Sequence, residues 1–122
     1  MPERPTQKEL NNKLKGAREA AENNDILLIN PHALAADALE LGYMIVNIAE
    51  ILAAVLEETR PRDYAGQRPP TRSYEDQIRD KELFAFKNNS KYLGCKIYLK
   101  FTLNAQVVWL VSLHEDRRKP GR

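Results

Sequence analysis

The chain has 122 residues, the length of one ordinary domain, of which 43% are hydrophobic and 30% charged. This composition excludes a largely disordered chain and a membrane-embedded one. A single cysteine, Cys95, excludes an internal disulfide, and with only two distant histidines, His32 and His114, a zinc enzyme is not expected. The first ten residues lack the apolar stretch of a signal peptide, so we expect a cytoplasmic protein with no bound metal or cofactor.

The net charge of +2 hides an uneven distribution. Residues 1–58 carry five Lys or Arg against ten Asp or Glu, whereas residues 59–122 carry fourteen against seven. One domain with this division is expected to have an acidic surface and a basic surface. The basic surface either binds a polyanion or is an ordinary solvated surface, and composition alone favours the second interpretation.

The first half, about residues 6–58, is predicted to be helical. Thr6 and Glu9 have the spacing of a capping box, and an apolar stripe follows before Asn23 and Asn24 end the helix: Leu10, Leu14, Ala17 and Ala21. Residues 26–29 are a short strand or a buried connector. Asn30-Pro31 predicts the start of a second helix that ends at Gly42. Residues 47–50 repeat the capping-box spacing before a third, clearly amphipathic helix.

Residues 60–74 contain three prolines, a glycine and four arginines, a composition that excludes a helix interior or a central strand. A loop within the domain and a flexible linker both fit, and we favour the loop because one core needs both flanks. Strands are predicted at 82–86, 96–103 and 107–114, with turns at 88–90 and 104–106. Residues 115–122 are predicted to be a basic tail. The pattern indicates a single α+β domain, with N-terminal helices packed on an antiparallel sheet over about 82–114.

The register of the last hairpin depends on which residues share its buried face. A two-residue turn at Asn104-Ala105 mixes polar and apolar residues on each face. A three-residue turn pairs Leu103 with Val107 and Phe101 with Trp109, and places eight apolar residues on one face. We therefore predict the three-residue turn, with the Trp109 ring in the core.

This register predicts the composition of the opposite face. Lys96 would lie across from His114, Tyr98 across from Ser112, and Lys100 beside them. An imidazole can transfer a proton near neutral pH, and lysines can stabilise charge that develops on a phosphate. These groups suit cleavage of a phosphodiester without metal, although an ordinary polar surface has the same residue types.

The hairpin residues resemble a known family. The segments KIYLKF (96–101) and VVWLVSLHE (107–115) are similar to the C-terminal hairpin of MqsR-type toxins of the RelE/ParE superfamily, which has a Tyr-Leu-Lys strand followed by a Val-Ser-Phe-Lys/His-Glu strand. The order of the upstream elements over residues 8–115 also agrees. The resemblance implies a RelE-like fold and a type II toxin that cleaves mRNA without metal, on or off the ribosome, and is inhibited by a partner antitoxin.

The resemblance also implies roles for individual residues. Tyr98 matches the strand tyrosine of the family, His114 stands where the family often has lysine, and Lys100 completes the Tyr-Leu-Lys strand. A basic residue after the third helix corresponds to Arg60 or Arg62. A glutamine of the family falls at Ala85, which cannot replace it.

The predicted mechanism is attack of a ribose 2′-hydroxyl on the adjacent phosphate. The catalytic residues are Tyr98, His114 and Lys100, and four further side chains are predicted to bind RNA: Lys96, Arg60, Arg62 and Arg72. The alternative is a non-catalytic RelE-like protein that binds RNA, a ribosome or a partner protein. The absent glutamine favours this alternative, whereas Tyr98 and His114 favour the enzyme.

Overall fold

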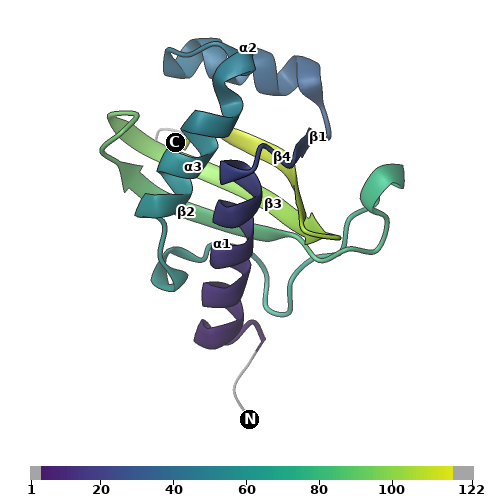
Figure 1. Cartoon of the computed structure of the whole chain (residues 1–122). Coiled ribbons are helices and arrows are strands. Elements are labelled where there is room, and N and C mark those ends of the chain that lie inside the picture. Colours follow the sequence, from purple (N-terminus) through teal and green to yellow (C-terminus); the bar gives the residue numbers. More distant parts are fainter. Residues whose placement is uncertain (1–3, 117–122) are drawn as a thin grey trace, which may run out of the picture.

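A computed structural model describes residues 4–116 of the chain (Figure 1). Within these residues lie three α-helices, α1 (Gln7–Glu22), α2 (Pro31–Leu41) and α3 (Ile48–Glu58), together with four β-strands. The strands are β1 (Ile26–Leu28), β2 (Phe84–Ser90), β3 (Cys95–Asn104) and β4 (Val107–Glu115). The helices precede the three long strands, so the α+β class predicted from the sequence is confirmed.

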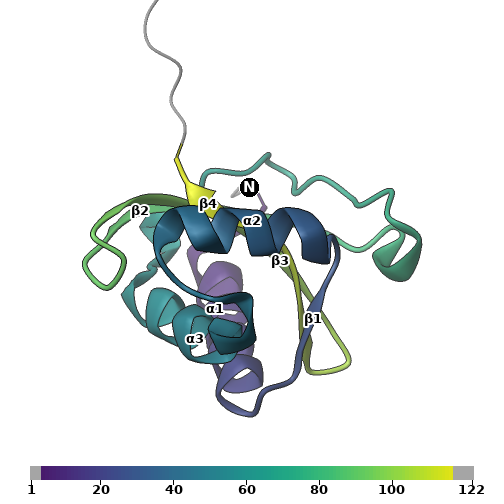
Figure 2. The same ribbon diagram turned by 90° about the horizontal axis from the view of Figure 1, so that it is seen from above.

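The strands form one mixed sheet in the order β1-β4-β3-β2. β1 runs parallel to β4, which makes residues 26–28 a strand rather than a connector, and the other pairs are antiparallel. α1 and α3 cover one face of the sheet, and α2 packs beside β4 (Figures 1 and 2). The segment between α3 and β2 passes over the opposite face, as the view from above shows (Figure 2).

The predicted starts of all three helices are confirmed, but the side-chain capping bond predicted for α3 is not. The Thr6 hydroxyl accepts a hydrogen bond from the Glu9 amide (3.1 Å), and the Asn30 side chain accepts one from the Ala33 amide (3.3 Å). Among the described residues, by contrast, Asn47 receives no capping bond. Instead, a 3₁₀ turn (Ile45–Asn47) leads directly into α3, so the capping box predicted at residues 47–50 is wrong.

One hydrophobic core joins the two halves of the chain. Leu14 of α1 and Leu52 of α3 belong to the same buried cluster as Phe86 of β2 and Phe101 of β3, whose rings stack with centroids 5.9 Å apart. The segment at 60–74 is attached to the sheet as well, because Tyr64 forms a backbone bridge with Phe86. The proline-rich segment is therefore a loop of the same domain and not a linker.

β2 is longer than the sequence indicated, because residues 88–90 are strand and not turn. The Asn88 amide donates to the Thr59 hydroxyl (3.2 Å), and the Ser90 hydroxyl donates to the Glu58 carboxylate (2.6 Å). Both side chains face the helices and form hydrogen bonds with residues at the C-terminal end of α3. Their partners explain why a polar sequence continues the strand, and the turn follows at residues 91–94.

The predicted register of the β3–β4 hairpin is wrong. The turn contains two residues, Ala105 and Gln106, both with positive φ (54° and 65°), and Leu103 pairs with Val108. A β-bulge then leaves Val111 without an opposite residue, since Phe101 pairs with Leu110 and Lys100 pairs with Ser112. The bulge changes which residues of β4 face the helices: Val108, Leu110 and Leu113 are buried.

Trp109 consequently lies on the other face of the sheet, opposite Thr102, and is not a member of the core cluster. This placement corrects the prediction that Trp109 packs against Phe101. The indole Nε1 is buried and has no hydrogen-bond partner among the described residues.

The described chain ends at Asp116, so the expected basic residues 117–122 lie outside it. The prediction that the basic tail begins at residue 115 is wrong, because residues 115 and 116 are acidic and Glu115 belongs to β4. Within residues 4–116 no single helix is long and apolar enough to cross a membrane, although residues 31–41 and 45–58 meet that criterion together as a pair bent by 92°.

Candidate functional site: the open face of the sheet

Tyr98 and His114 are direct cross-strand partners on the sheet face opposite α1 and α3. We call this surface the open face; its polar residues include Lys87 and Asn89 of β2, Lys96, Tyr98 and Lys100 of β3, and Ser112 and His114 of β4. The rings of Tyr98 and His114 stack with centroids 5.3 Å apart and planes inclined by 26°. The predicted pairs Lys96–His114 and Tyr98–Ser112 are wrong, and the observed register brings the phenol and the imidazole closer together.

The hydrogen bond of His114 determines the tautomer of its neutral ring. Nδ1 lies 2.7 Å from the backbone oxygen of Glu115. A carbonyl oxygen can only accept, so Nδ1 carries the proton and Nε2 has the lone pair. This tautomer leaves Nε2 able to accept a proton from a substrate.

Tyr98 is half-buried, and burial raises the pKa of its phenol above the ordinary value. The phenol therefore remains protonated at neutral pH and can donate a hydrogen bond. As a base it is poorly suited, because burial disfavours the phenolate. Of the two stacked rings, His114 is thus the better proton acceptor and Tyr98 the better donor.

Two lysines lie close to the Tyr98 ring. The ammonium groups of Lys87 and Lys100 are each 6.0 Å from the centroid of its ring. Lys100 was predicted from the sequence, whereas Lys87 was missed because the predicted strand ended at Phe86. The alternation of Ala85, Lys87 and Asn89 was the available signal, since every second residue of a strand faces the same side.

A pocket of about 230 Å³ adjoins Tyr98. Its walls come from the sheet and from the loop that crosses the open face: Ala65, Gly66, Gln67, Thr71, Leu83, Ala85, Tyr98 and Lys100. Ala85, which occupies the position expected for a glutamine from the resemblance, lies in this wall. Gln67 contributes an amide residue from the loop, and no sequence pattern placed it there.

Lys96 lies on the open face but opposite Asn89 rather than His114. Its ammonium nitrogen is 4.0 Å from the Asp116 carboxylate, and the same carboxylate is 3.4 Å from the ammonium of Lys87. Both lysines are about two-fifths exposed, whereas the Asp116 side chain is only 9% exposed. No pattern in the sequence indicates that Asp116 lies between two cations.

The predicted arginines do not line the Tyr98 pocket. Arg60 and Arg62 line a separate cavity of about 200 Å³ with Gln7 and Pro61, at the start of α1. The Arg60 guanidinium donates to the backbone oxygen of Glu57 (2.6 Å). The backbone of Arg72 bridges to Glu82 at the far end of the loop. The structure thus brings together Tyr98, His114, Lys100 and Lys96, and separates Arg60 and Arg62 from them.

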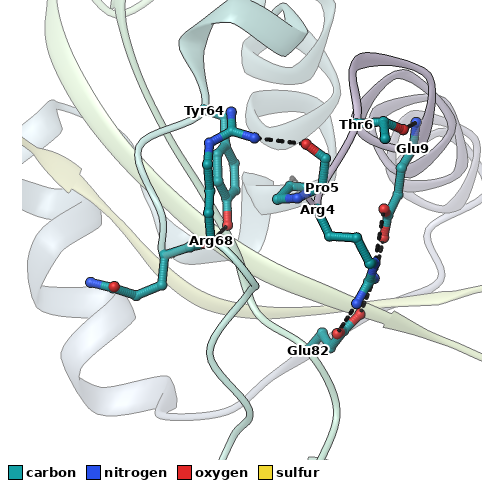
Figure 3. Close-up of polar contacts among 8 residues, drawn as sticks. Arg4, Pro5, Thr6, Glu9, Tyr64, Arg68 and Glu82 are labelled. Carbon is teal, nitrogen blue, oxygen red and sulfur yellow. Dashed lines mark hydrogen bonds and ion pairs between the residues drawn. The ribbon is translucent and has the colours of Figure 1, made fainter. Parts of the chain in front are cut away.

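Contacts with the N-terminal segment hold the loop in place (Figure 3). The Arg68 guanidinium lies 5.0 Å from the centre of the Tyr64 ring and donates to the backbone oxygen of Pro5 (2.7 Å). Arg4 forms ion pairs with Glu82 (2.8 Å) and Glu9. These contacts fix both ends of the segment that forms the outer wall of the Tyr98 pocket.

Among residues 4–116, no three His, Cys, Asp or Glu side chains are grouped so that they could hold a metal ion. No protein-family model matches the chain, and no curated protein sequence matches it.

Proposed function

We propose that the protein is a metal-independent endoribonuclease that cleaves mRNA, the toxin of a type II toxin–antitoxin pair. The observation that carries this proposal is the stacked pair of Tyr98 and His114 on the open face, with the ammonium groups of Lys87 and Lys100 each 6.0 Å from the centre of the phenol ring. Cleavage of an RNA phosphodiester by the adjacent ribose 2′-hydroxyl requires a proton acceptor, a proton donor and cations that stabilise the phosphate charge. The open face has a proton acceptor, a proton donor and two cations.

In the proposed reaction the ribose 2′-oxygen forms a bond to the adjacent phosphorus while the bond to the 5′-oxygen breaks. Nε2 of His114 accepts the proton of the 2′-hydroxyl, and water protonates the departing 5′-oxygen. The products are a 2′,3′-cyclic phosphate and a 5′-hydroxyl end. Tyr98 donates a hydrogen bond that orients the phosphate, and Lys87 and Lys100 stabilise the charge of the pentacoordinate transition state.

The proposed partners follow from the resemblance and from the charge of the open face. The substrate is mRNA, free or on the ribosome, in the cytoplasm. The antitoxin is expected to present acidic side chains to the lysines of the open face, because charge complementarity steers association and excludes the substrate. The basic excess of residues 59–122 supports an anionic partner on this side.

A second candidate is a non-catalytic RelE-like protein that binds RNA, a ribosome or a partner protein. Ala85 in the pocket wall favours it, because a methyl group supplies no hydrogen bond where the resemblance expects an amide. The position of Arg60 and Arg62 on a different cavity favours it as well.

Inducible expression distinguishes the two candidates when growth and transcript integrity are followed in the same culture. The nuclease predicts growth arrest together with new 5′-hydroxyl RNA ends, and both effects should disappear in His114→Ala. His32→Ala is the matched control, because His32 lies at the exposed start of α2, outside the open face. Intact transcripts, with or without growth arrest, would contradict the nuclease and favour the binding protein.

A further inference from the structure

The Asp116 carboxylate lies on the open face between two ammonium groups. Its oxygens are 3.4 Å from Nζ of Lys87 and 4.0 Å from Nζ of Lys96, although the two lysines come from different strands. The Asp116 amide also donates to the backbone oxygen of Lys96 (2.8 Å), and this bond holds the backbone of Asp116 beside β3. Two cations thus converge on one anionic group beside the proposed catalytic centre.

The distances indicate that Asp116 does not saturate these lysines. Direct bonds between an ammonium and a carboxylate are typically about 2.7–2.9 Å, shorter than both separations. Each ammonium has three donors, and both lysine side chains remain about two-fifths exposed. Lys87 is also within 6.0 Å of the Tyr98 ring, so an anion bound by the two lysines would adjoin the reacting phosphate.

We infer that Lys87 and Lys96 form a subsite for a neighbouring phosphate of single-stranded RNA, and that Asp116 occupies this subsite in the free protein. The inference rests on the proposed function and deepens it. RNA binding displaces the carboxylate, because the polyanion offers both lysines a stronger and more exposed acceptor. Asp116 therefore weakens binding of RNA and limits how many phosphates the open face neutralises.

The test measures binding of a single-stranded 2′-O-methyl RNA, which cannot be cleaved because its nucleophile is blocked. Asp116→Asn should tighten the dissociation constant at low salt by roughly threefold to tenfold. It should also steepen the plot of log affinity against log salt by about 0.7 for each phosphate gained. Asp76→Asn is the matched control, because it removes the same charge from an exposed pair with Arg79, outside the open face.

The lysines provide the second measurement. In the Asp116→Asn background, Lys87→Ala and Lys96→Ala should each flatten the salt dependence by about 0.7. If Asp116→Asn does not fold, as judged by thermal unfolding, the salt dependence of RNA binding is measured for Lys87→Ala and Lys96→Ala in the wild-type chain instead, and it tests the same subsite. The inference is overturned if Asp116→Asn binds no more tightly than Asp76→Asn, or if neither lysine change alters the salt dependence.

These measurements distinguish failure of the phosphate subsite from failure of the proposed nuclease. Cleavage of unmodified RNA without any effect of Asp116→Asn on binding would retain the nuclease and remove the subsite. Tighter binding by Asp116→Asn without cleavage by any variant would retain the phosphate subsite and favour the non-catalytic candidate. If the wild-type chain and every variant fail to bind RNA, both the subsite and the nuclease are wrong.

Discussion

The Tyr98 phenol and the His114 imidazole stack across β3 and β4, with their ring centroids 5.3 Å apart. Cross-strand pairing alone brings them together, so their geometry depends on the register of one hairpin. The bulge between Lys100 and Phe101 sets that register and turns His114 towards the open face. The proposed chemistry can therefore be tested by substitutions that leave the core intact.

Removing the imidazole should abolish most of the cleavage. We expect His114→Ala to lower the rate by roughly 100-fold to 10,000-fold, the usual contribution of a general acid or base. The variant should stay folded, because His114 lies outside the core cluster. Single-turnover cleavage of a labelled RNA in excess chelator measures the effect, and His32→Ala should match the wild-type rate. A folded His114→Ala protein with full activity would exclude this residue from the mechanism.

The Tyr98 phenol should titrate above the ordinary tyrosine value of about 10, because burial disfavours the phenolate. The difference between the tyrosinate absorbance of the wild-type chain and that of Tyr98→Phe isolates this group during an alkaline titration. Tyr98→Phe should also reduce cleavage less than His114→Ala, since the phenol is proposed to orient the phosphate and not to transfer a proton. Equal losses in the two variants would instead assign proton transfer to Tyr98.

Lys87 should contribute more to cleavage than Arg62. Its ammonium lies 6.0 Å from the Tyr98 ring, whereas Arg62 lines a different cavity near the start of α1. Lys87→Ala should reduce kcat/KM at least about tenfold through lost stabilisation of phosphate charge. Arg62→Ala should have a smaller effect under the same conditions. The reverse order would place the reaction at the arginine cavity.

Gly66→Ala should destabilise the loop over the Tyr98 pocket. A Cβ at this position would lie 2.7 Å from the Tyr64 hydroxyl oxygen and 2.9 Å from Cζ of the same ring. The ring packs edge-on against Phe86 and its hydroxyl donates to the Gln67 carbonyl, so it cannot move freely. We expect a loss of about 1–3 kcal/mol in the free energy of unfolding. Denaturant unfolding would contradict the packing if Gly66→Ala and the wild-type chain had equal stability.

Stability should fall at high pH because of Tyr43. Burial, followed in size by the negative charge of Asp37, raises its pKa from 10.0 to about 12. Between these values the folded chain binds more protons than the unfolded chain, so stability decreases as pH rises from about 10 to about 12. Below pH 10 this contribution is fully present. Denaturant unfolding across this range should show a smaller decrease in Tyr43→Phe, and an equal decrease would assign the effect to other groups.

The helical half was predictable because its signals are local. Thr6 and Asn30 cap their helices as expected, and the apolar stripes of α1 and α3 face the sheet. A capping residue acts within three or four residues, so the sequence contains its partner. Asn47 is the exception, since a preceding 3₁₀ turn changes its geometry.

The hairpin register was not predictable from alternation alone. The expected turn started at Asn104, but the positive φ angles occur at Ala105 and Gln106, two residue types that rarely adopt them. Burial of Val108 and Leu110 against the helices outweighs that local preference. The bulge then restores His114 to the open face, which no periodic pattern in the sequence indicates.

The site was predictable only where it lies on regular strands. Tyr98 and Lys100 follow from the alternation of β3, whereas His114 was indicated by the resemblance and its place on the open face depends on the bulge. Gln67 and the pocket wall depend on how a proline-rich loop folds back over the sheet, through contacts as distant as Arg68 with Pro5. Side-chain contacts between residues more than sixty positions apart have no signature in one sequence.

The parallel pairing of β1 with β4 also determines the order in which the molecule can be completed. β2, β3 and β4 are joined by short turns and can pair soon after they are synthesised, whereas Ile26 can pair only after Val108 is made, with about two thirds of the chain between them. The segments that form α1, β1 and α2 therefore emerge from the ribosome long before the other strands of the sheet have been synthesised. Because β4 also carries His114, the nascent chain has no assembled Tyr98–His114 pair until this last strand emerges, and the same event completes both the fold and the proposed catalytic centre.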